Sequence, residues 1–347
     1  MKTLQLLSKS PETIPARTSW YLADLGEARG RQELFTRQAP QKLKILREHA
    51  LIESAVSSNR IEGVTVEQSR IGTLVFGKPT LRDRGEEEVR GYRDALRLVH
   101  EKGPKLPVSE RTILRLHRLS RGNVWDAGKY KDKDVDIIQR YADGRQRVRF
   151  RTVAAADTPK YTAEMIMLWQ QGLRERWAHP LILLAALDLD FLCIHPFRDG
   201  NGRVSRLLLL LGCYHLGFEV GRYISLERII EQSKERYYET LEQSSAGWHK
   251  GRHDPWPYIN YLLFTLKEAY AEFEKRVGQV KDAPGAKTAL VEEAIASFPG
   301  NFTLSALERI CPGVSRDMIR RVLWRMQKAG RLKCLRRGPG AVWGKRV

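Results

Sequence analysis

Two strongly apolar segments, residues 181–194 and 207–213, enclose a polar stretch of this chain. Neither segment reaches the ~20 apolar residues that a membrane-spanning helix needs, and Asp188 and Asp190 interrupt the first one. The two segments therefore predict buried helices of a globular core and no membrane partner. A polar stretch between two buried helices is held rigidly at their ends, so residues 195–206 are the strongest candidate for a functional site.

Apolar residues recur at helical spacing through most of the first 280 residues. The predicted helices cover residues 43–58, 86–98, 109–119, 161–177, 180–194, 204–216, 226–244 and 256–277. Residues 135–153 differ, because two short extended runs flank Asp143 and Gly144, which predicts a β-hairpin. The expected fold class is therefore mainly α, with one hairpin among the helices.

A Pro-Gly break within residues 282–285 predicts a boundary between structural units. Beyond it, the pattern predicts three helices and then two short strands, at residues 288–297, 303–310, 315–329, 331–335 and 341–343. That order is typical of a small winged helix. The 347 residues are thus expected to form an N-terminal helical region (1–100), a core (101–280) and a winged-helix domain (286–347).

Positive charge is concentrated towards the end of the chain. The formal net charge is +19, and residues 281–347 carry fourteen Lys or Arg against five Asp or Glu. Arg316, Arg320, Arg321 and Arg325 alternate with apolar residues, which predicts a helix with one packed face and one basic face. Such a helix can bind DNA, although a protein-docking surface and a merely solvated basic surface are the alternatives.

The predicted location is the cytoplasm. The first fifteen residues lack the long apolar run and the small-residue cleavage site of an export signal. The four cysteines, Cys193, Cys213, Cys311 and Cys334, are far apart and form no C-x-x-C pair, so they predict reduced thiols.

The polar stretch has the composition of a phosphate-binding loop. Gly200 and Gly202 let the backbone approach a ligand closely, and free N–H groups at the start of the following helix favour an anion. Arg203 and Arg206 lie three residues apart, on one face of that helix, where they can neutralise phosphates. Asp199 suits a divalent cation held between phosphate oxygens, and His195 suits proton abstraction at neutral pH.

This stretch resembles the motif of the Fic (filamentation induced by cAMP) family, H-x-F-x-[D/E]-G-N-G-R-x-x-R. The matching residues are His195, Phe197, Asp199, Gly200, Asn201, Gly202, Arg203 and Arg206. The resemblance implies a Fic all-helical fold with a hairpin flap, and transfer of AMP from ATP to a protein hydroxyl. It implies that His195 is the general base, that Asp199 binds Mg²⁺, and that Phe197 anchors the loop.

The same resemblance assigns the nucleotide contacts. Gly200, Asn201 and Gly202 would form the anion hole, while Arg203 and Arg206 would contact the β- and γ-phosphates. Val204 and Ser205, inside the motif, are counted with the ATP-binding residues. Tyr237 and Tyr238 belong to a segment similar to the family's R-x-x-Y-Y-x-x-L neighbourhood and would approach the adenine.

An inhibitory motif is the second point of resemblance. Ser58, Glu62 and Gly63 match the family's [S/T]-x-x-x-E-[G/N] motif. In that family the Glu pairs with the second motif Arg, here Arg206, so that ATP binds unproductively. The 135–153 hairpin corresponds to the flap that aligns the target segment.

The function predicted from these residues is that of an Mg²⁺-dependent protein adenylyltransferase, autoinhibited by Glu62. Its expected partners are ATP, a Tyr, Thr or Ser hydroxyl of a target protein or of the chain itself, and DNA through the winged helix. A homodimer is left open. The alternatives are a hydrolase that removes AMP from proteins and a nucleotide-sensing DNA-binding regulator.

Overall fold

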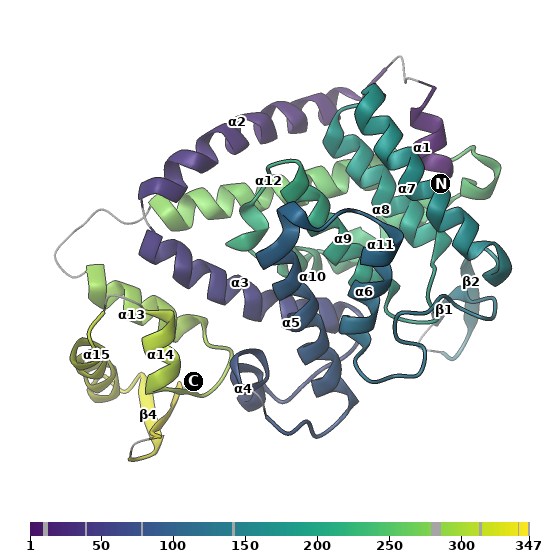
Figure 1. Cartoon of the computed structure of the whole chain (residues 1–347). Helices are drawn as coiled ribbons and strands as arrows, with labels where there is room; N and C mark the ends of the chain where they lie inside the picture. Colours follow the sequence, from purple (N-terminus) through teal and green to yellow (C-terminus); the bar gives the residue numbers. More distant parts are fainter. Residues whose placement is uncertain are drawn as a thin grey trace.

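The computed structural model describes residues 1–9, 13–38, 40–77, 79–140, 143–278, 286–311, 314–338 and 340–345. The predicted linker at 282–285 lies outside these residues. The described part of the chain is mainly helical, which confirms the predicted fold class (Figure 1). None of its helices combines the length and the apolar character that crossing a membrane requires.

The helices up to the site are α1 (Lys2–Leu7), α2 (Ala16–Gln38), α3 (Pro40–Ile61), α4 (Ile71–Phe76), α5 (Arg84–Lys102), α6 (Glu110–Arg121), α7 (Thr158–Glu175), α8 (Pro180–Ile194) and α9 (Asn201–His215). Those beyond it are α10 (Leu226–Gln232), α11 (Lys234–Ser245), α12 (Trp256–Gly278), α13 (Ala286–Ser297), α14 (Leu304–Ile310) and α15 (Arg316–Lys328). The strands are β1 (Asp136–Arg140), β2 (Gln146–Arg151), β3 (Phe302–Thr303), β4 (Leu332–Arg336) and β5 (Val342–Lys345).

Helices α8 and α9 form the centre of the main core. Every residue of α8 from Leu181 to Ile194 is buried, and so is α9 from Arg203 to Tyr214. One hydrophobic cluster contains residues from Met1 to Val277, so the helices before and after α8 share a core. The segment that joins α8 to α9 is therefore fixed at both ends by buried helices.

One predicted helix is divided in the structure. Residues 226–244 form two helices, α10 and α11, that meet at Ser233. The Ser233 hydroxyl donates to the Ile229 carbonyl (2.9 Å) and contacts the Tyr261 hydroxyl (2.9 Å). Such side-chain bonds to the preceding turn compete with the helical pattern, which is why the apolar periodicity alone missed the break.

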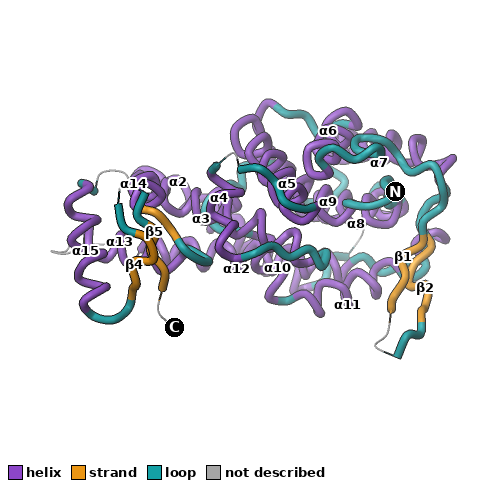
Figure 2. The backbone as a smooth tube through the Cα atoms, turned by 90° about the horizontal axis from the view of Figure 1, so that it is seen from below, coloured by secondary structure: helices purple, strands orange, loops and turns teal. Residues whose placement is uncertain are grey.

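The hairpin and the C-terminal unit lie at opposite ends of the molecule (Figure 2). Strands β1 and β2 pair antiparallel with a bulge between Ile137 and Ile138. In the C-terminal unit, α13, α14 and α15 pack on an antiparallel sheet of order β3–β5–β4. The core of this unit also includes Ile45 of α3, so the C-terminal unit is packed against that helix.

A buried carboxylate joins α1 to α8. Asp190, in α8, is fully buried and accepts hydrogen bonds from the Thr3 and Leu4 amides (2.9 Å each) and from the Trp248 indole (2.6 Å). The two amides belong to the first turn of α1, where they have no partner within the helix. Asp190 therefore satisfies α1 from another part of the chain.

We expect Asp190→Ala to lower the free energy of unfolding by about 3 kcal/mol, because it leaves buried donors without an acceptor. Urea unfolding followed by circular dichroism measures this change. Asp157→Ala is the matched control, since Asp157 is exposed and caps no helix through its side chain, and it should shift stability by less than about 0.5 kcal/mol. An equal change in the free energy of unfolding for the two substitutions would contradict the proposal that Asp190 stabilises α1.

Candidate active site

The loop between α8 and α9 is locked by Asn201 and Phe197. The Asn201 side chain accepts from the Phe197 amide (2.9 Å) and donates to the Phe197 carbonyl (2.8 Å). The Phe197 ring is fully buried and stacks on the ring of His117, with centroids 3.7 Å apart. Phe197 is thus a buried anchor of the loop, and the Asn201 side chain holds the backbone of Phe197 in place.

His117, in α6, is a second support that the sequence did not reveal. Its Nδ1 accepts from the Gly128 amide (2.9 Å), so the neutral ring donates through Nε2 to the Asp199 carbonyl (3.0 Å). Burial lowers the pKa of His117 to about 4, which keeps the ring in this neutral form. The stacking and the hydrogen bond together fix the loop on both sides of Arg198.

His195 ends α8 in a left-handed conformation (φ 52°). Its Nδ1 lies 3.3 Å from the Leu192 carbonyl, so the neutral ring donates there and leaves Nε2 as a proton acceptor. Burial and the nearby Lys131 lower the pKa of His195 to about 4, so the ring is neutral at pH 7. The backbone of Lys131 also holds the next residue, since its amide donates to the Pro196 carbonyl (2.9 Å). His195 is therefore neutral at pH 7, and its contact with the Leu192 carbonyl fixes the orientation of the ring.

The end of α3 binds Arg206. Arg206 is 3% exposed, and it donates to the Ser58 hydroxyl (2.9 Å), to the Ser58 carbonyl (2.9 Å) and to Oε1 of Glu62 (2.8 Å). Burial alone would lower the pKa of the Arg206 guanidinium, but the Glu62 carboxylate raises it above its ordinary value. The structure thus brings Ser58, Glu62 and Arg206 together, as the motif spacing suggests.

Gly63, directly after Glu62, has φ +83°, a conformation that glycine adopts without strain. At Gly202 the structure requires glycine because a side chain would not fit there. A Cβ on residue 202 would lie 2.2 Å from Oε1 of Glu62, so the carboxylate lies against the first turn of α9. A carboxylate at a helix N-terminus is stabilised by the free N–H groups there. The Glu62 carboxylate therefore lies beside the first turn of α9 while it pairs with Arg206.

Arg203 is held by Glu88 of α5. The Arg203 side chain is 1% exposed, and Nη1 lies 2.7 Å from Oε2 of Glu88 and 3.2 Å from Oδ1 of Asn59. Neither Glu88 nor Asn59 was singled out from the sequence. The Nε atom of Arg203 and the Nη1 atom of Arg206 are buried and have no hydrogen-bond partner among the described residues. Each arginine therefore has one donor that the described part of the chain leaves unsatisfied.

Asp199 is the exposed acid of the loop. Its side chain is 57% exposed, and Oδ2 lies 2.5 Å from Nη1 of Arg121. Its Oδ1 accepts from the Gly200 amide (2.5 Å) and lies 3.5 Å from Nη2 of Arg203. Burial raises the pKa of this carboxyl, but Arg203 and Arg121 hold it below the ordinary value overall, so Asp199 is ionised at neutral pH.

The described residues contain no cluster of three metal-binding side chains. Mg²⁺ is often bound by one or two carboxylates together with substrate phosphates, and Asp199 fits that mode because it is ionised and exposed at the loop. The fit requires the cation to share the carboxylate with Arg121, which already contacts Oδ2.

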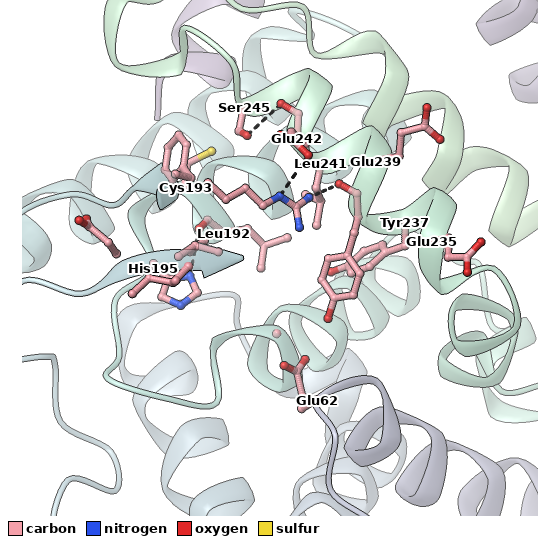
Figure 3. Close-up of a pocket in the computed structure, with 17 residues that line it drawn as sticks. Glu62, Leu192, Cys193, His195, Glu235, Tyr237, Glu239, Leu241, Glu242 and Ser245 are labelled. Atoms are coloured by element: carbon pink, nitrogen blue, oxygen red, sulfur yellow. Dashed lines mark hydrogen bonds and ion pairs between the residues drawn. The ribbon is translucent and has the colours of Figure 1, made fainter. Parts of the chain in front are cut away.

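A cavity of ≈ 760 Å³ opens beside these groups. Its lining includes Glu62, His195, Gly202, Tyr237 and Tyr238 (Figure 3). The hairpin forms another part of the wall, through residues of β1 and β2. The volume is within the usual range for a site that takes a small molecule.

The two tyrosines differ in their surroundings. Tyr237 is 2% exposed, whereas Tyr238 is half-buried, with its hydroxyl 3.4 Å from the Ile61 carbonyl and its ring 5.3 Å from the Arg149 guanidinium. Burial, with the charge of Glu62, raises the pKa of Tyr238 to about 12, so it stays protonated. Arg149 also donates to the Tyr238 carbonyl, which joins β2 to α11.

Of the predicted ATP-binding residues, Gly202, Tyr237 and Tyr238 line the cavity, whereas the side chains of Val204 and Ser205 have other contacts. The Val204 side chain is fully buried in the main core. Ser205 is buried and donates to Oδ1 of Asp188 (2.6 Å). Their side chains serve the packing of α9, and the Val204 amide donates to the Gly200 carbonyl (3.0 Å).

Comparison with known proteins finds a family model that matches the part of the chain containing the loop. Residues 107–212 match the model of the Fic/DOC family. The chain contains a Fic/DOC domain. The fold is also similar to a crystal structure of a Fic family protein from Desulfovibrio desulfuricans G20, with 24% identity, a TM-score of 0.63 and coverage of 97% of this chain and 98% of the other. A Fic domain-containing signaling protein from Bacteroides thetaiotaomicron VPI-5482 has 21% identity and a TM-score of 0.60, with coverage of 75% and 99%.

Two curated relatives are named as enzymes. The protein adenylyltransferase Fic of Nematostella vectensis is 26% identical over 246 residues, which is 67% of this chain and 51% of that protein. The protein adenylyltransferase fic-1 of Caenorhabditis elegans is 26% identical over 220 residues, which is 60% and 37%. The chain thus spans about half of the first relative and less of the second. The Fic/DOC domain itself extends over α6 to α9 and includes His117 and the whole loop.

The state of His195 can be tested by NMR titration. We expect its imidazole to titrate near pH 4, because the folded environment disfavours the charged ring. The unfolded ring takes up a proton near pH 6.5, so the free energy of unfolding should fall as the pH drops from about 6.5 towards 4 and should not change through this group above that range. His195→Ala should have a smaller decrease over the same range. A midpoint near 6.5 would show that the ring is solvated.

Proposed function

We propose that this chain is a protein adenylyltransferase that transfers AMP from ATP to a protein hydroxyl. The observation that carries the proposal is that His195, whose Nδ1 contacts the Leu192 carbonyl, lines the same cavity as Gly202 in the first turn of α9. Arg203 in that turn and Arg206 one turn later each have a buried donor that no described residue satisfies. A proton acceptor beside an anion site is the arrangement that transfer to a hydroxyl needs. The names of the two curated relatives support the same reaction.

In this mechanism the triphosphate binds at the start of α9. Gly200, Asn201 and Gly202 provide the anion hole, and Arg203 and Arg206 neutralise the β- and γ-phosphates. Mg²⁺, when bound, neutralises phosphate charge, and Asp199 is the residue of this chain that would hold it. His195 Nε2 accepts the proton of the target hydroxyl as its oxygen attacks the α-phosphorus, and pyrophosphate leaves.

Autoinhibition by Glu62 belongs to the same proposal. Glu62 lies against the first turn of α9 and pairs with Arg206, so it competes with the γ-phosphate for one guanidinium. Its side chain is 29% exposed, and Arg206 is its only ionic partner among the described residues. A carboxylate held in this way can be displaced, and its permanent removal leaves Arg206 with its two contacts to Ser58.

We expect Glu62→Gly to increase transfer of label from ATP labelled on the α-phosphate by roughly 10- to 100-fold, since ATP no longer has to displace a charge-assisted hydrogen bond worth ~1.5–3 kcal/mol. His195→Ala in the same background should lower transfer by ~10²–10⁴-fold, because it removes the proton acceptor. Gel autoradiography, with mass spectrometry of the labelled chain, measures both the extent of transfer and the acceptor residue.

No transfer by the wild type or Glu62→Gly would exclude the transferase. Loss of AMP from a premodified protein that requires Glu62 would instead support the hydrolase. Arg60→Gly, two residues before Glu62, is the matched control, because Arg60 is exposed and its ion pair with Glu231 is long, at 3.9 Å, and therefore weak. Its activity should equal that of the wild type.

We also propose that the C-terminal unit is a winged helix that binds DNA. Helix α15 buries Ile319, Val322 and Leu323 and exposes a basic face. Trp324 on that face is 63% exposed, a large apolar group available to a partner. Arg316, Arg320 and Arg325 pair with nearby acids, but exposed pairs of this kind are weak and can exchange for phosphates.

Replacing Arg320 and Arg321 together by Ser should weaken DNA binding and make the slope of log K against log salt shallower by roughly 1–2, because each phosphate contact contributes about 0.9. Fluorescence anisotropy of a labelled duplex at several salt concentrations measures that slope. Lys160 and Arg174, exposed on α7, replaced by Ser provide a control with the same change in net charge. Equal slopes for the two double variants would exclude α15 as the DNA-binding surface.

A further inference from the structure

Both arginines of the phosphate-binding loop are paired with a carboxylate from outside the loop. Arg206 pairs with Glu62 (2.8 Å), and Arg203 pairs with Glu88 (2.7 Å). The proposed function gives Glu62 an inhibitory role, because it competes with phosphate. The same argument would make Glu88 a second inhibitor unless the surroundings of the two acids differ.

The surroundings do differ. The Glu88 side chain is 7% exposed, and its other oxygen, Oε1, lies 2.9 Å from Arg121 and 3.0 Å from Arg84. Glu88 is thus the common acceptor of three guanidinium groups, and it comes from the interior of α5 rather than from a helix end. Displacing Glu88 would leave buried cations without a counter-charge, which costs far more than displacing Glu62, whose side chain is 29% exposed.

Glu88 also belongs to a closed ring of charges. Arg203 contacts Glu88, Glu88 contacts Arg121, Arg121 contacts Asp199 (2.5 Å), and Asp199 lies 3.5 Å from Arg203. The ring joins α5, α6, the loop and α9. Because each member has two neighbours in the ring, the orientation of Arg203 is set before any ligand arrives.

This orientation leaves one donor of Arg203 unsatisfied within the described part of the chain. Nη1 of Arg203 contacts Glu88 and Asn59, and Nη2 lies near Asp199, whereas Nε is buried and has no partner among the described residues. An unpaired buried donor is costly unless something occupies it in the working protein. A phosphate oxygen is the acceptor that fits a guanidinium in a basic, buried place.

We propose that Glu88 is a positioning residue, which stays paired with Arg203 while nucleotide binds and so fixes that arginine for the β-phosphate. The proposal rests on the proposed function for the identity of the phosphate. Glu62 and Glu88 thus have opposite roles: Glu62 has to leave its arginine for activity, and Glu88 has to remain.

The test is the binding of AMP, ADP and ATP, with Mg²⁺, to the full chain carrying Glu62→Gly, measured by calorimetry. Adding Glu88→Gln, which keeps the shape and removes the charge, should weaken ADP and ATP binding on the order of 10-fold, the scale known for groups that orient a ligand-binding residue. AMP binding should not change, because AMP has no β-phosphate. Glu87→Gln is the matched control: Glu87 is the adjacent residue and also pairs with Arg84 (2.8 Å), but it accepts nothing from Arg203.

An equal loss for all three nucleotides, or the same selective loss with Glu87→Gln, would overturn the proposal, since either would indicate a structural or general electrostatic effect. If Glu88→Gln did not fold, Glu88→Asp keeps the charge but shortens the side chain, and it should shift the ratio of ADP to AMP affinity in the same direction. An unchanged ratio in a folded Glu88→Asp protein would overturn the proposal as well.

A measurement without nucleotide separates this proposal from the proposed function. Absence of binding to Glu62→Gly itself would contradict the proposed function alone. In that case ¹⁵N NMR of arginine side chains decides the role of Glu88. We expect two distinct Nη signals for Arg203 in the Glu62→Gly protein and in its Glu87→Gln derivative, because the pairing hinders rotation of the guanidinium. The signals should merge in the Glu88→Gln derivative, and two separate signals there would overturn the proposal.

Discussion

The two guanidinium groups buried beneath the first turn of α9 determine much of the surrounding architecture. Arg203 and Arg206 are 1% and 3% exposed, and a buried cation is tolerated only when it is paired and hydrogen-bonded. The Fic/DOC loop itself contributes only Asp199 to this charge balance. The remaining partners come from α3 and α5, which precede the matched domain in sequence, so the N-terminal helices complete the site electrostatically.

Helix α3 links this site to the other end of the molecule. Its 22 residues extend ~33 Å at the rise of an α-helix. Ile45 near its beginning belongs to the core of the C-terminal unit, and His49 contacts the Ser297 hydroxyl of α13. Ser58 near its end holds Arg206. A single rigid element is therefore shared by the two cores, and its position is fixed from both ends.

The spacing of apolar residues predicted the helices that are buried along one face or on all sides. Helix α8 begins and ends where the apolar run predicts, and two of the motif residues, His195 and Gly202, line the cavity. Helix α2 was not predicted, because its residues are mostly polar and show no apolar stripe, and it is stabilised by packing along α12. The break at Ser233 was missed for a related reason: a tertiary contact with Tyr261 overrides the local pattern.

The ring of charges formed by Arg203, Glu88, Arg121 and Asp199 could not be predicted from the sequence. Glu88 lies on the same helical stripe as the buried residues Tyr92, Ala95 and Val99, so its position already required a buried partner. The sequence offers 60 Lys and Arg as partners, and nothing local to α5 selects among them. Arg121 and Arg203 become its partners only because α6 and α9 pack against α5. The helical spacing of the sequence can therefore indicate that an acid is buried. Its function depends on which cations the fold packs against it, and the sequence alone does not show them.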